Sequence, residues 1–255
     1  SSDITLIVPA AGKSSRYPGS KPKWMLTHPD GMLMIEKVLN DFKYEKYKKT
    51  YITILKNHCT DFEADLVLRQ SFGNTIELLV LDNPTDSCPE TIYETIKKGN
   101  IEGRIAIKDT DCLVVPEQVP SENFIVGMTI DENSNVEKLQ NKSFIVKNEN
   151  NIVQDIVEKR IVSNNICLGV YCLLAKDFVE AYNEINASRI FFKKTEIYVS
   201  HIISHLILNS DKLFQCVQAV KYEDWGTIKE WEKEKQKYNT YIFNIDGIAI
   251  TKREK

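Results

Sequence analysis

The sequence lacks the features that define metal-clipped, membrane and exported proteins. None of its six cysteines form a CxxC pair, which argues against a zinc site of that type. No apolar run reaches the ~18 residues that span a membrane, and the start of the sequence has no signal-peptide pattern. Several cysteines lie inside apolar runs such as NNICLGVYCLL, which favours reduced thiols in a core. We therefore expect a cytoplasmic protein with no membrane partner.

A strong charge of one sign and internal repeats are also missing. The net charge is only -3, so bulk attraction to nucleic acid is not expected, and no repeat or low-complexity tract interrupts the chain. What is present is an ordinary globular composition, with 42% hydrophobic and 27% charged residues in a length of 255. This length is enough for a substantial core in one large domain or two small ones, and it does not indicate an oligomeric state.

The first 115 residues alternate between strand and helix patterns. Strand-like runs cover residues 3–11, 49–56, 75–82 and 103–115, and helical patterns cover residues 29–48, 60–73 and 87–99. The helix at 60–73 has Thr60 or Asp61 as a candidate N-cap and Gly73 as a stop, and Ser87 with Glu90 predicts a capping box for the next one. This alternation predicts an α/β fold with a Rossmann-like, mostly parallel sheet between two layers of helices.

The second half of the sequence changes character. Strand patterns cover residues 122–131, 142–160, 165–174 and 214–227, helical patterns cover 175–185, 195–210 and 228–238, and a hairpin is predicted at 241–252. The hairpin sequence YIFNIDGIAI resembles the first motif of HAD phosphatases, but Asn244 stands where that motif has its nucleophilic aspartate. We expect a plain strand-turn-strand with Asp246 and Gly247 in the turn.

The loop that follows the first strand, IVPAAGKSSRYPGSKPKWML, concentrates small and basic residues. A P-loop would need glycine at position 7, which is Ile7, and a dinucleotide fingerprint would need glycines where Ser14 and Tyr17 stand. The small residues allow a ligand close to the backbone, and the cations suit a polyphosphate. A solvated basic loop is the alternative. The residues concerned are Ala10, Ala11, Gly12, Lys13, Ser14, Ser15, Arg16 and Lys23.

On these residues the loop resembles the fingerprint of nucleotidyltransferases that activate sugar phosphates, G-x-G-[ST]-R followed by P-K. Gly12, Ser15, Arg16, Pro22 and Lys23 fit the pattern, and Ser14 replaces its second glycine. The resemblance implies a nucleotidyltransferase fold of the GT-A-like type with a smaller β subregion that binds the acceptor. It also implies a single domain over 1–255, with a nucleotide-binding half at 1–115, an acceptor-binding half at 116–230, and a terminal helix and hairpin at 231–255.

Acidic residues lie toward the end of the fourth strand-like run. Strand periodicity would put Asp109 and Asp111 on one face, where carboxylates can hold a metal ion, although a surface acidic turn has the same sequence. By resemblance, Asp111 and Asp224 of YEDWGT would be the ligands of Mg²⁺, or of Mn²⁺ in its place, and Asp109 would join the nucleotide site. For Asp224, an ordinary turn aspartate is the alternative.

Later segments extend the resemblance in the correct order. The motif IVQDIVEKR would supply Glu158, Lys159 and Arg160 to the acceptor, and the acceptor site would also include Gly169 and Glu196. Lys23, Arg16 and Lys159 are the expected catalytic residues, with Lys159 on the phosphate of the acceptor. The loop NPTDSCPET corresponds to the base-contacting loop, so Ser87 and Thr91 are expected near the base. For the Ser87 side chain we favour the helix cap over a base contact.

The expected partners are an NTP, CTP or UTP, and a phosphorylated small molecule. Arg160 replaces a usual proline, and Tyr17 and Trp24 are unusual aromatic residues in the fingerprint. These departures resemble pyrimidine-NTP enzymes of bacterial capsule and surface-polysaccharide synthesis, including cytidylyltransferases that act on phosphoglutamine. A sugar-1-phosphate uridylyltransferase or thymidylyltransferase is the alternative within the family. A metal-dependent glycosyltransferase and a non-catalytic nucleotide-binding relative are alternatives of other classes.

Overall fold

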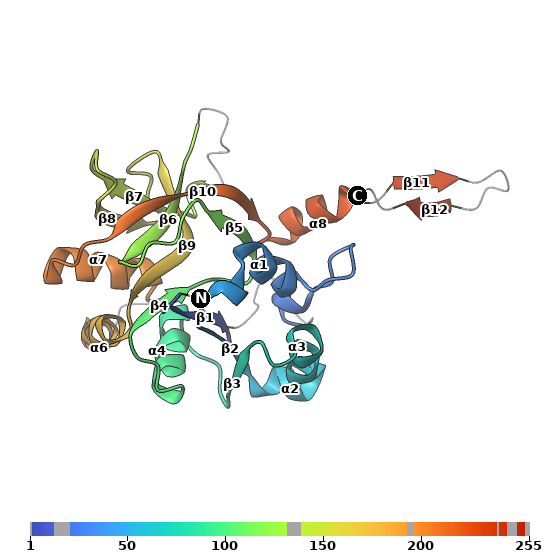
Figure 1. Cartoon of the computed structure of the whole chain (residues 1–255), viewed down its shortest axis with the longest axis horizontal. Helices are drawn as coiled ribbons and strands as arrows, with labels where there is room; N and C mark the ends of the chain where they lie inside the picture. Colours follow the sequence, from blue (N-terminus) through green and yellow to red (C-terminus); the bar gives the residue numbers. More distant parts are fainter. Residues whose placement is uncertain are drawn as a thin grey trace.

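The fold is built on one ten-stranded sheet. A computed structural model describes residues 2–12, 21–131, 139–192, 196–238, 240–243 and 249–252, of which 190–192 and the last two segments are described by their backbone only. Figure 1 shows the elements. The strands of the sheet are β1 (Thr5–Ala10), β2 (Lys49–Leu55), β3 (Glu77–Leu81), β4 (Arg104–Ile107), β5 (Cys112–Pro116), β6 (Phe124–Thr129), β7 (Ser143–Lys147), β8 (Val153–Glu158), β9 (Asn165–Leu174) and β10 (Gln215–Asp224).

Helices connect these strands. They are η1 (Lys23–Met25), α1 (Met34–Phe42), η2 (Tyr44–Lys46), α2 (Lys56–Phe62), α3 (Ala64–Phe72), α4 (Cys88–Lys98), α6 (Ala175–Phe192), α7 (Val199–Ser210) and α8 (Ile228–Gln236). None of the helices in the described ranges combines the length and the apolar character needed to cross a membrane.

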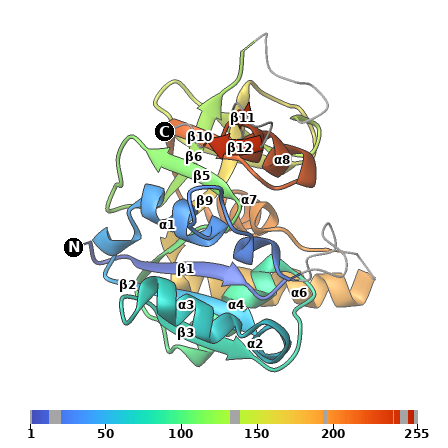
Figure 2. The same cartoon turned by 90° about the vertical axis from the view of Figure 1, so that its right-hand side faces the viewer.

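The strands follow the order β3-β2-β1-β4-β9-β6-β10-β5, and most neighbours along this path are parallel. In Figure 2 the arrowheads of β1 and β3 point the same way. The chain moves outward from β1 to β3 and then returns to the other side of β1 to form β4. This reversal is the topological switch point at which open α/β sheets bind ligands, beyond the carboxyl ends of the strands.

Two layers of helices cover the sheet, as the sequence predicts. Leu6 and Val8 of β1 face a cluster that includes buried residues of α1 and α3, whereas Ile7 between them faces a cluster with residues of α4, α6 and α7. This alternation is the two-residue period of a strand buried on both faces. Figure 1 shows α4 and α6 on one side of β1 to β4 and α1 and α3 on the other. The mixed α/β, three-layer fold with a mostly parallel central sheet is confirmed.

One helix of the first half is divided in two. The expectation of a single helix at 60–73 capped by Thr60 or Asp61 is wrong, because α2 begins directly after β2 at Lys56 and the helical path breaks at Glu63. Glu63 has φ 55°, which ends α2 in the left-handed conformation and starts α3. Gly73 closes α3 as expected, with its N–H on the carbonyl oxygen of Arg69 at 2.8 Å.

The fourth strand is also divided. Residues 103–115 form β4 and β5 with a loop between them, and β5 leaves β4 to pair with β10 at the far edge of the sheet. Two helices are shorter than expected: α1 ends where Lys43 takes φ 58°, and α7 begins at Val199 rather than at 195. The hairpin predicted at 241–252 is present as β11 (Thr240–Phe243) and β12 (Ala249–Lys252), and its turn, with Asn244, Asp246 and Gly247, lies outside the described residues.

Candidate active site

The candidate site lies at the switch point, where β1 and β4 end side by side. Beyond β1 the chain turns at Ala11 and Gly12, and Ala10 and Ala11 are buried while Gly12 is exposed. Gly12 lines a cavity of about 400 Å³, together with Pro9, Thr85, Asp86, Ser87, Cys88, Thr91 and Glu196. The structure therefore brings the small-residue turn next to the start of α4, as a nucleotide-binding edge requires.

The start of α4 is fixed by its cap. Ser87 Oγ accepts a hydrogen bond from the N–H of Glu90 at 3.3 Å, which is the capping role favoured for this side chain. The carboxylate of Glu90 accepts from the N–H of Asp86 instead of Ser87, so the expected capping box is only half formed. Thr91 is buried and shares a hydrogen bond with Thr85 at 2.6 Å. The cavity wall at this end is thus held by hydrogen bonds and carries hydroxyl groups.

Asp111 is the first acid of the site and lies in the loop between β4 and β5. Its Oδ2 is 2.6 Å from Nζ of Lys23, which comes from η1. Burial alone would raise the pKa of the Asp111 carboxyl, but the charge and hydrogen bond of Lys23 outweigh it and hold this pKa below its usual range. Asp111 is therefore ionised at neutral pH. Its contact with Lys23 joins the basic loop after β1 to the loop between β4 and β5.

Asp224 is the second acid and ends β10. Its carboxylate pairs with the ammonium group of Lys142 and accepts from the N–H of Gly226 at 2.7 Å. Burial raises the pKa of Asp224, but Lys142 more than offsets this and the pKa lies below its usual value. The Sγ atom of Cys112 is 3.7 Å from Oδ1 of Asp111 and 3.6 Å from Oδ1 of Asp224, so the two carboxylates flank one thiol.

Asp109 is the third acid. It pairs with Lys108, whose side chain is fully buried and also donates to the carbonyl oxygen of Cys112 at 2.8 Å. Burial raises the pKa of Asp109 to about 6, with Lys108 opposing and Asp111 adding to the rise. Gly169, with φ +76°, approaches so closely that a Cβ atom on it would lie 2.8 Å from Oδ2 of Asp109.

The proximity of Asp109 and Asp111 does not arise from strand periodicity. That expectation is wrong, because both residues lie in the loop between β4 and β5. The loop nevertheless gathers possible ligand atoms: within the described residues, one atom each from Asp109, Asp111 and Cys112 lie within 4.8 Å of one another. Carboxylate oxygens are the donors that Mg²⁺ prefers. Burial and the neighbouring aspartates raise the pKa of the Cys112 thiol well above its usual value, so this group is protonated and unsuited to Mg²⁺.

A fourth basic group lies at the end of the β7–β8 hairpin. Nζ of Lys159 donates to the hydroxyl of Tyr198 at 2.7 Å, which raises the pKa of Lys159, and it lies 4.7 Å from the centre of the Tyr198 ring. The Tyr198 hydroxyl in turn donates to Glu196 at 3.1 Å. Glu158 accepts from Ser143 and from Ser200, the latter at 2.6 Å, and Arg160 is exposed. These contacts bring Lys159 and Glu196 together through Tyr198.

Four residues of the basic loop, Lys13, Ser14, Ser15 and Arg16, lie outside the described residues. Three residues that sequence reasoning did not select, Lys108, Lys142 and Tyr198, contact selected ones. Lys108 stands next to Asp109 in the sequence and could have been noticed as a buried charge in an apolar strand. No local signal marks Lys142, since it meets Asp224 only through the fold.

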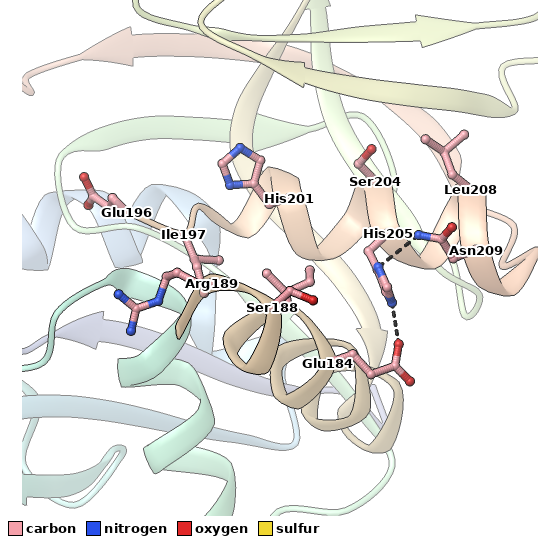
Figure 3. A pocket seen from close by; sticks show the side chains of 11 residues that line it. Glu184, Ser188, Arg189, Glu196, Ile197, His201, Ser204, His205, Leu208 and Asn209 are labelled. Carbon is pink, nitrogen blue, oxygen red and sulfur yellow. Dashed lines mark hydrogen bonds and ion pairs between the residues drawn. The ribbon is translucent and has the colours of Figure 1, made fainter. Parts of the chain in front are cut away.

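A second cavity, of about 600 Å³, lies between α6 and α7 (Figure 3). Its far end is closed by His205, whose Nε2 is 2.5 Å from a carboxylate oxygen of Glu184 and whose Nδ1 is 3.0 Å from the amide of Asn209. Arg189 and Glu196 lie at the opposite end. Glu196 lines both cavities, so the α6–α7 cavity borders the candidate site.

The architecture around this site is that of nucleotidyltransferases. The crystal structure of a nucleoside-diphosphate-sugar pyrophosphorylase from Vibrio cholerae RC9 superposes with a TM-score of 0.75 at 20% sequence identity, covering 91% of this chain and 99% of that chain. No protein-family model matches the sequence, and no curated protein matches it. At this identity the likeness defines a nucleotidyltransferase-like fold.

Two further solved structures have the same fold. The inositol-1-phosphate CTP transferase from T. maritima has a TM-score of 0.68 at 14% identity, covering 92% of this chain and 96% of that chain. A UTP-bound UGPase from Acinetobacter baumannii has a TM-score of 0.66 at 16% identity and covers 93% of each chain. The similarity thus extends over both halves of the chain.

Proposed function

We propose that this protein is a Mg²⁺-dependent nucleotidyltransferase that joins an NTP to a phosphorylated small molecule and releases pyrophosphate. The observation that carries the proposal is the convergence of Asp111 and Asp224 on the Cys112 thiol, with Lys23 and Lys142 on their carboxylates. These two acids come from opposite halves of the chain. Paired carboxylates for a divalent cation, next to lysines at the switch point, suit a reaction between two phosphorylated compounds.

In this proposal Asp111 and Asp224 hold the metal ion, and Asp109 lies beside them. When bound, Mg²⁺ would supply positive charge that stabilises the phosphate oxygens in the transition state. Lys23, with Lys13 and Arg16 of the basic loop, would bind the triphosphate, and Lys159 would hold the acceptor phosphate. An oxygen of that phosphate forms a bond to the α-phosphorus, and the bond from the α-phosphorus to pyrophosphate breaks, with pyrophosphate taking the electron pair. The attacking oxygen is already anionic at pH 7, so no general base is needed.

For the nucleotide we propose a pyrimidine NTP, CTP or UTP. The base would lie in the cavity lined by Gly12, Ser87 and Thr91. Two of the structural neighbours are described as a CTP transferase and as UTP-bound, which supports a pyrimidine. Because the side chains of Ser87 and Thr91 are engaged with Glu90 and Thr85, we expect backbone groups of this wall to contact the base edge.

For the acceptor we propose a phosphorylated compound used in bacterial capsule or surface-polysaccharide synthesis, with phosphoglutamine as one candidate. Lys159 and Arg160 are exposed and adjacent, which suits an acceptor with a phosphate and a second anionic group such as a carboxylate. Glu196 would bind hydroxyl or amino groups of the same molecule. A sugar 1-phosphate is the competing acceptor within the same reaction.

The direct test is pyrophosphate release, measured with each of the four NTPs against a panel of phosphorylated acceptors in the presence of Mg²⁺. We expect release with CTP or UTP only. Release that is strongest with a hexose 1-phosphate would exclude the phosphoglutamine assignment but not the reaction class. Transfer from a nucleotide sugar without pyrophosphate would favour a metal-dependent glycosyltransferase, and nucleotide binding without any turnover would favour a non-catalytic relative.

Lys23→Met tests the role of the basic loop. We expect kcat/KM for pyrophosphate release to fall by about 10²–10³, because a preorganised cation on the transition-state charge is lost. Lys37→Met is the matched control, since Lys37 is also paired with an aspartate, Asp30, and both lysine side chains are 20% exposed. Equal losses in the two variants would contradict the assignment of Lys23.

A further inference from the structure

Lys142 stands beside one of the proposed metal ligands. It directly precedes β7, and its ammonium group contacts the carboxylate of Asp224 and the hydroxyl of Tyr222, the latter at 2.9 Å. The side chains of Lys142 and Asp224 are 21% and 18% exposed, so the pair is largely but not fully shielded from water. A lysine in this position neutralises the same carboxylate that a divalent cation would use.

The backbone places Lys142 next to the proposed acceptor lysine. The N–H of Lys159 donates to the carbonyl oxygen of Lys142 at 3.0 Å, where the two strands of the β7–β8 hairpin end together. Lys142 therefore lies between Asp224 on β10 and the hairpin end that carries Lys159. From this position a four-carbon side chain needs only a change of rotamer to leave Asp224.

The contacts of Lys142 differ from those of the third lysine of the cluster. Lys108 is fully buried and donates to the backbone carbonyl oxygens of Cys112 and Asp109 at 2.8 and 3.2 Å, which fixes it in the fold. Within the described part of the chain, the ammonium group of Lys142 donates hydrogen bonds to two side chains, one neutral and one charged. If the charged partner is taken by a metal ion, Lys142 is left as a partly shielded cation that needs a new anion.

We propose that Lys142 is an exchangeable counter-ion, which neutralises Asp224 in the free protein and transfers to a phosphate oxygen of the bound ligand when a divalent cation takes Asp224. The identity of that ligand as a substrate phosphate rests on the proposed function. The exchange keeps every charge paired in both states. It also makes metal binding and phosphate binding mutually dependent. The divalent cation releases Lys142 from Asp224, and Lys142 then binds the phosphate and raises its affinity.

The proposal predicts effects of opposite sign in one variant. In Lys142→Met the carboxylate of Asp224 loses its competing cation, so we expect Mn²⁺ alone to bind about three- to tenfold more tightly. The same variant lacks the cation that would meet the phosphate, so we expect pyrophosphate to bind about tenfold more weakly at saturating Mn²⁺. A purely structural role for Lys142 would weaken both.

Mn²⁺ binding is measured by the electron paramagnetic resonance signal of the free ion, and pyrophosphate binding by titration calorimetry. Lys147→Met is the control, because Lys147 lies at the other end of β7 and contacts Asn151 at 2.5 Å. We expect both of its affinities to equal those of the unaltered protein. Mn²⁺ affinity that is unchanged or lower in Lys142→Met overturns the proposal.

A second measurement keeps the proposal open to refutation if Lys142→Met does not fold. The lysines of the unaltered protein are labelled by reductive ¹³C-methylation, and the Lys142 resonance is assigned by its loss in Lys142→Arg. Diamagnetic Mg²⁺ takes the place of Mn²⁺ in this measurement. We expect the Lys142 resonance to shift when Mg²⁺ and pyrophosphate are added to the free protein. No shift would overturn the exchange. Neither measurement depends on turnover, so a failure of the proposed nucleotidyl transfer remains distinguishable from a failure of the counter-ion exchange.

Discussion

At the scale of single residues, the site depends on very close approaches. Gly169 lies on β9 and leaves no room for a side chain beside the carboxylate of Asp109, which pairs with buried Lys108 in the loop between β4 and β5. Its positive φ of +76° and the lack of a side chain are both needed there, because any Cβ would meet Asp109 Oδ2 at 2.8 Å. Gly169 thus allows β9 to pack closely against the loop that carries Asp109.

Gly169→Ala should lower the free energy of unfolding by about 2–4 kcal/mol, from backbone strain together with displacement of Asp109. The control is Gly103→Ala, since Gly103 also has positive φ, +78°, but nothing lies within 4 Å of its Cβ position. We expect this control to lose only about 1 kcal/mol from strain. Urea unfolding followed by circular dichroism measures both, and equal losses would show that the contact with Asp109 is unimportant.

Single residues also show where sequence reasoning succeeds and fails at the site. Asp111, Asp224 and Lys23 were selected from motifs at strand ends, and the fold brings them together. Lys142 was missed because it meets Asp224 across 82 residues of sequence, with no motif that marks it. A contact between a strand end and a hairpin end is set by how β7, β8 and β10 pack, and a single sequence does not encode that distance locally.

At the scale of elements, strong local signals correctly predicted where some helices begin and end, whereas the division of one strand depended on tertiary pairing. Ser87 and Gly73 marked the start of α4 and the end of α3, since caps act on adjacent backbone groups. The division of residues 103–115 into β4 and β5 was not predicted, although the polar run KDTD at 108–111 separates two apolar segments. Pairing of β5 with β10 decided it.

The element that follows Asp224 is held by a buried polar contact. Helix α8 presents Glu234 to His28, with 3.0 Å between Oε1 and Nε2, and His28 is surrounded by the rings of Trp225, Trp231 and Tyr238. His28 is two residues beyond Leu26, the cap of the helical turn that carries Lys23. The contact therefore ties the helix after one site acid to the segment that supplies the site lysine.

Glu234→Gln should remove the pH dependence that ionisation of Glu234 gives to the contribution of this contact to the free energy of unfolding. Burial raises the pKa of Glu234, but hydrogen bonds from His28 and Lys237 outweigh it and hold the pKa below its usual 4.5. A carboxyl whose pKa is lower in the folded state stabilises the fold above 4.5 and loses that contribution as the pH falls through the folded value. We expect Glu234→Gln to unfold at lower urea concentration at pH 7, and the difference to shrink as the pH falls below 4.5. A difference that stays constant as the pH falls below 4.5 would contradict this.

At the scale of the whole molecule, the two halves of the chain share one sheet. β9 of the second half lies between β4 and β6, and β5 of the first half pairs with β10 beyond them. The site inherits this arrangement, since Asp111 precedes β5 and Asp224 ends β10, where the N–H of Trp225 donates to the carbonyl oxygen of Asp111 at 2.8 Å. The site therefore takes its residues from both halves.

We therefore propose that residues 1–115 and 116–230 are halves of one domain and unfold together. In Trp24→Phe the remaining tryptophans, Trp225 and Trp231, report on a cluster that joins α1, β5 and α8. The urea transition seen by their fluorescence should coincide with the transition in far-ultraviolet circular dichroism, which reports on all elements. The substitution is mild, because the buried indole nitrogen of Trp24 has no hydrogen-bond partner within the described part of the chain. Two separated transitions would instead mean that the nucleotide and acceptor halves are independent domains, and the pairing of β4 with β9 would then contribute little to stability.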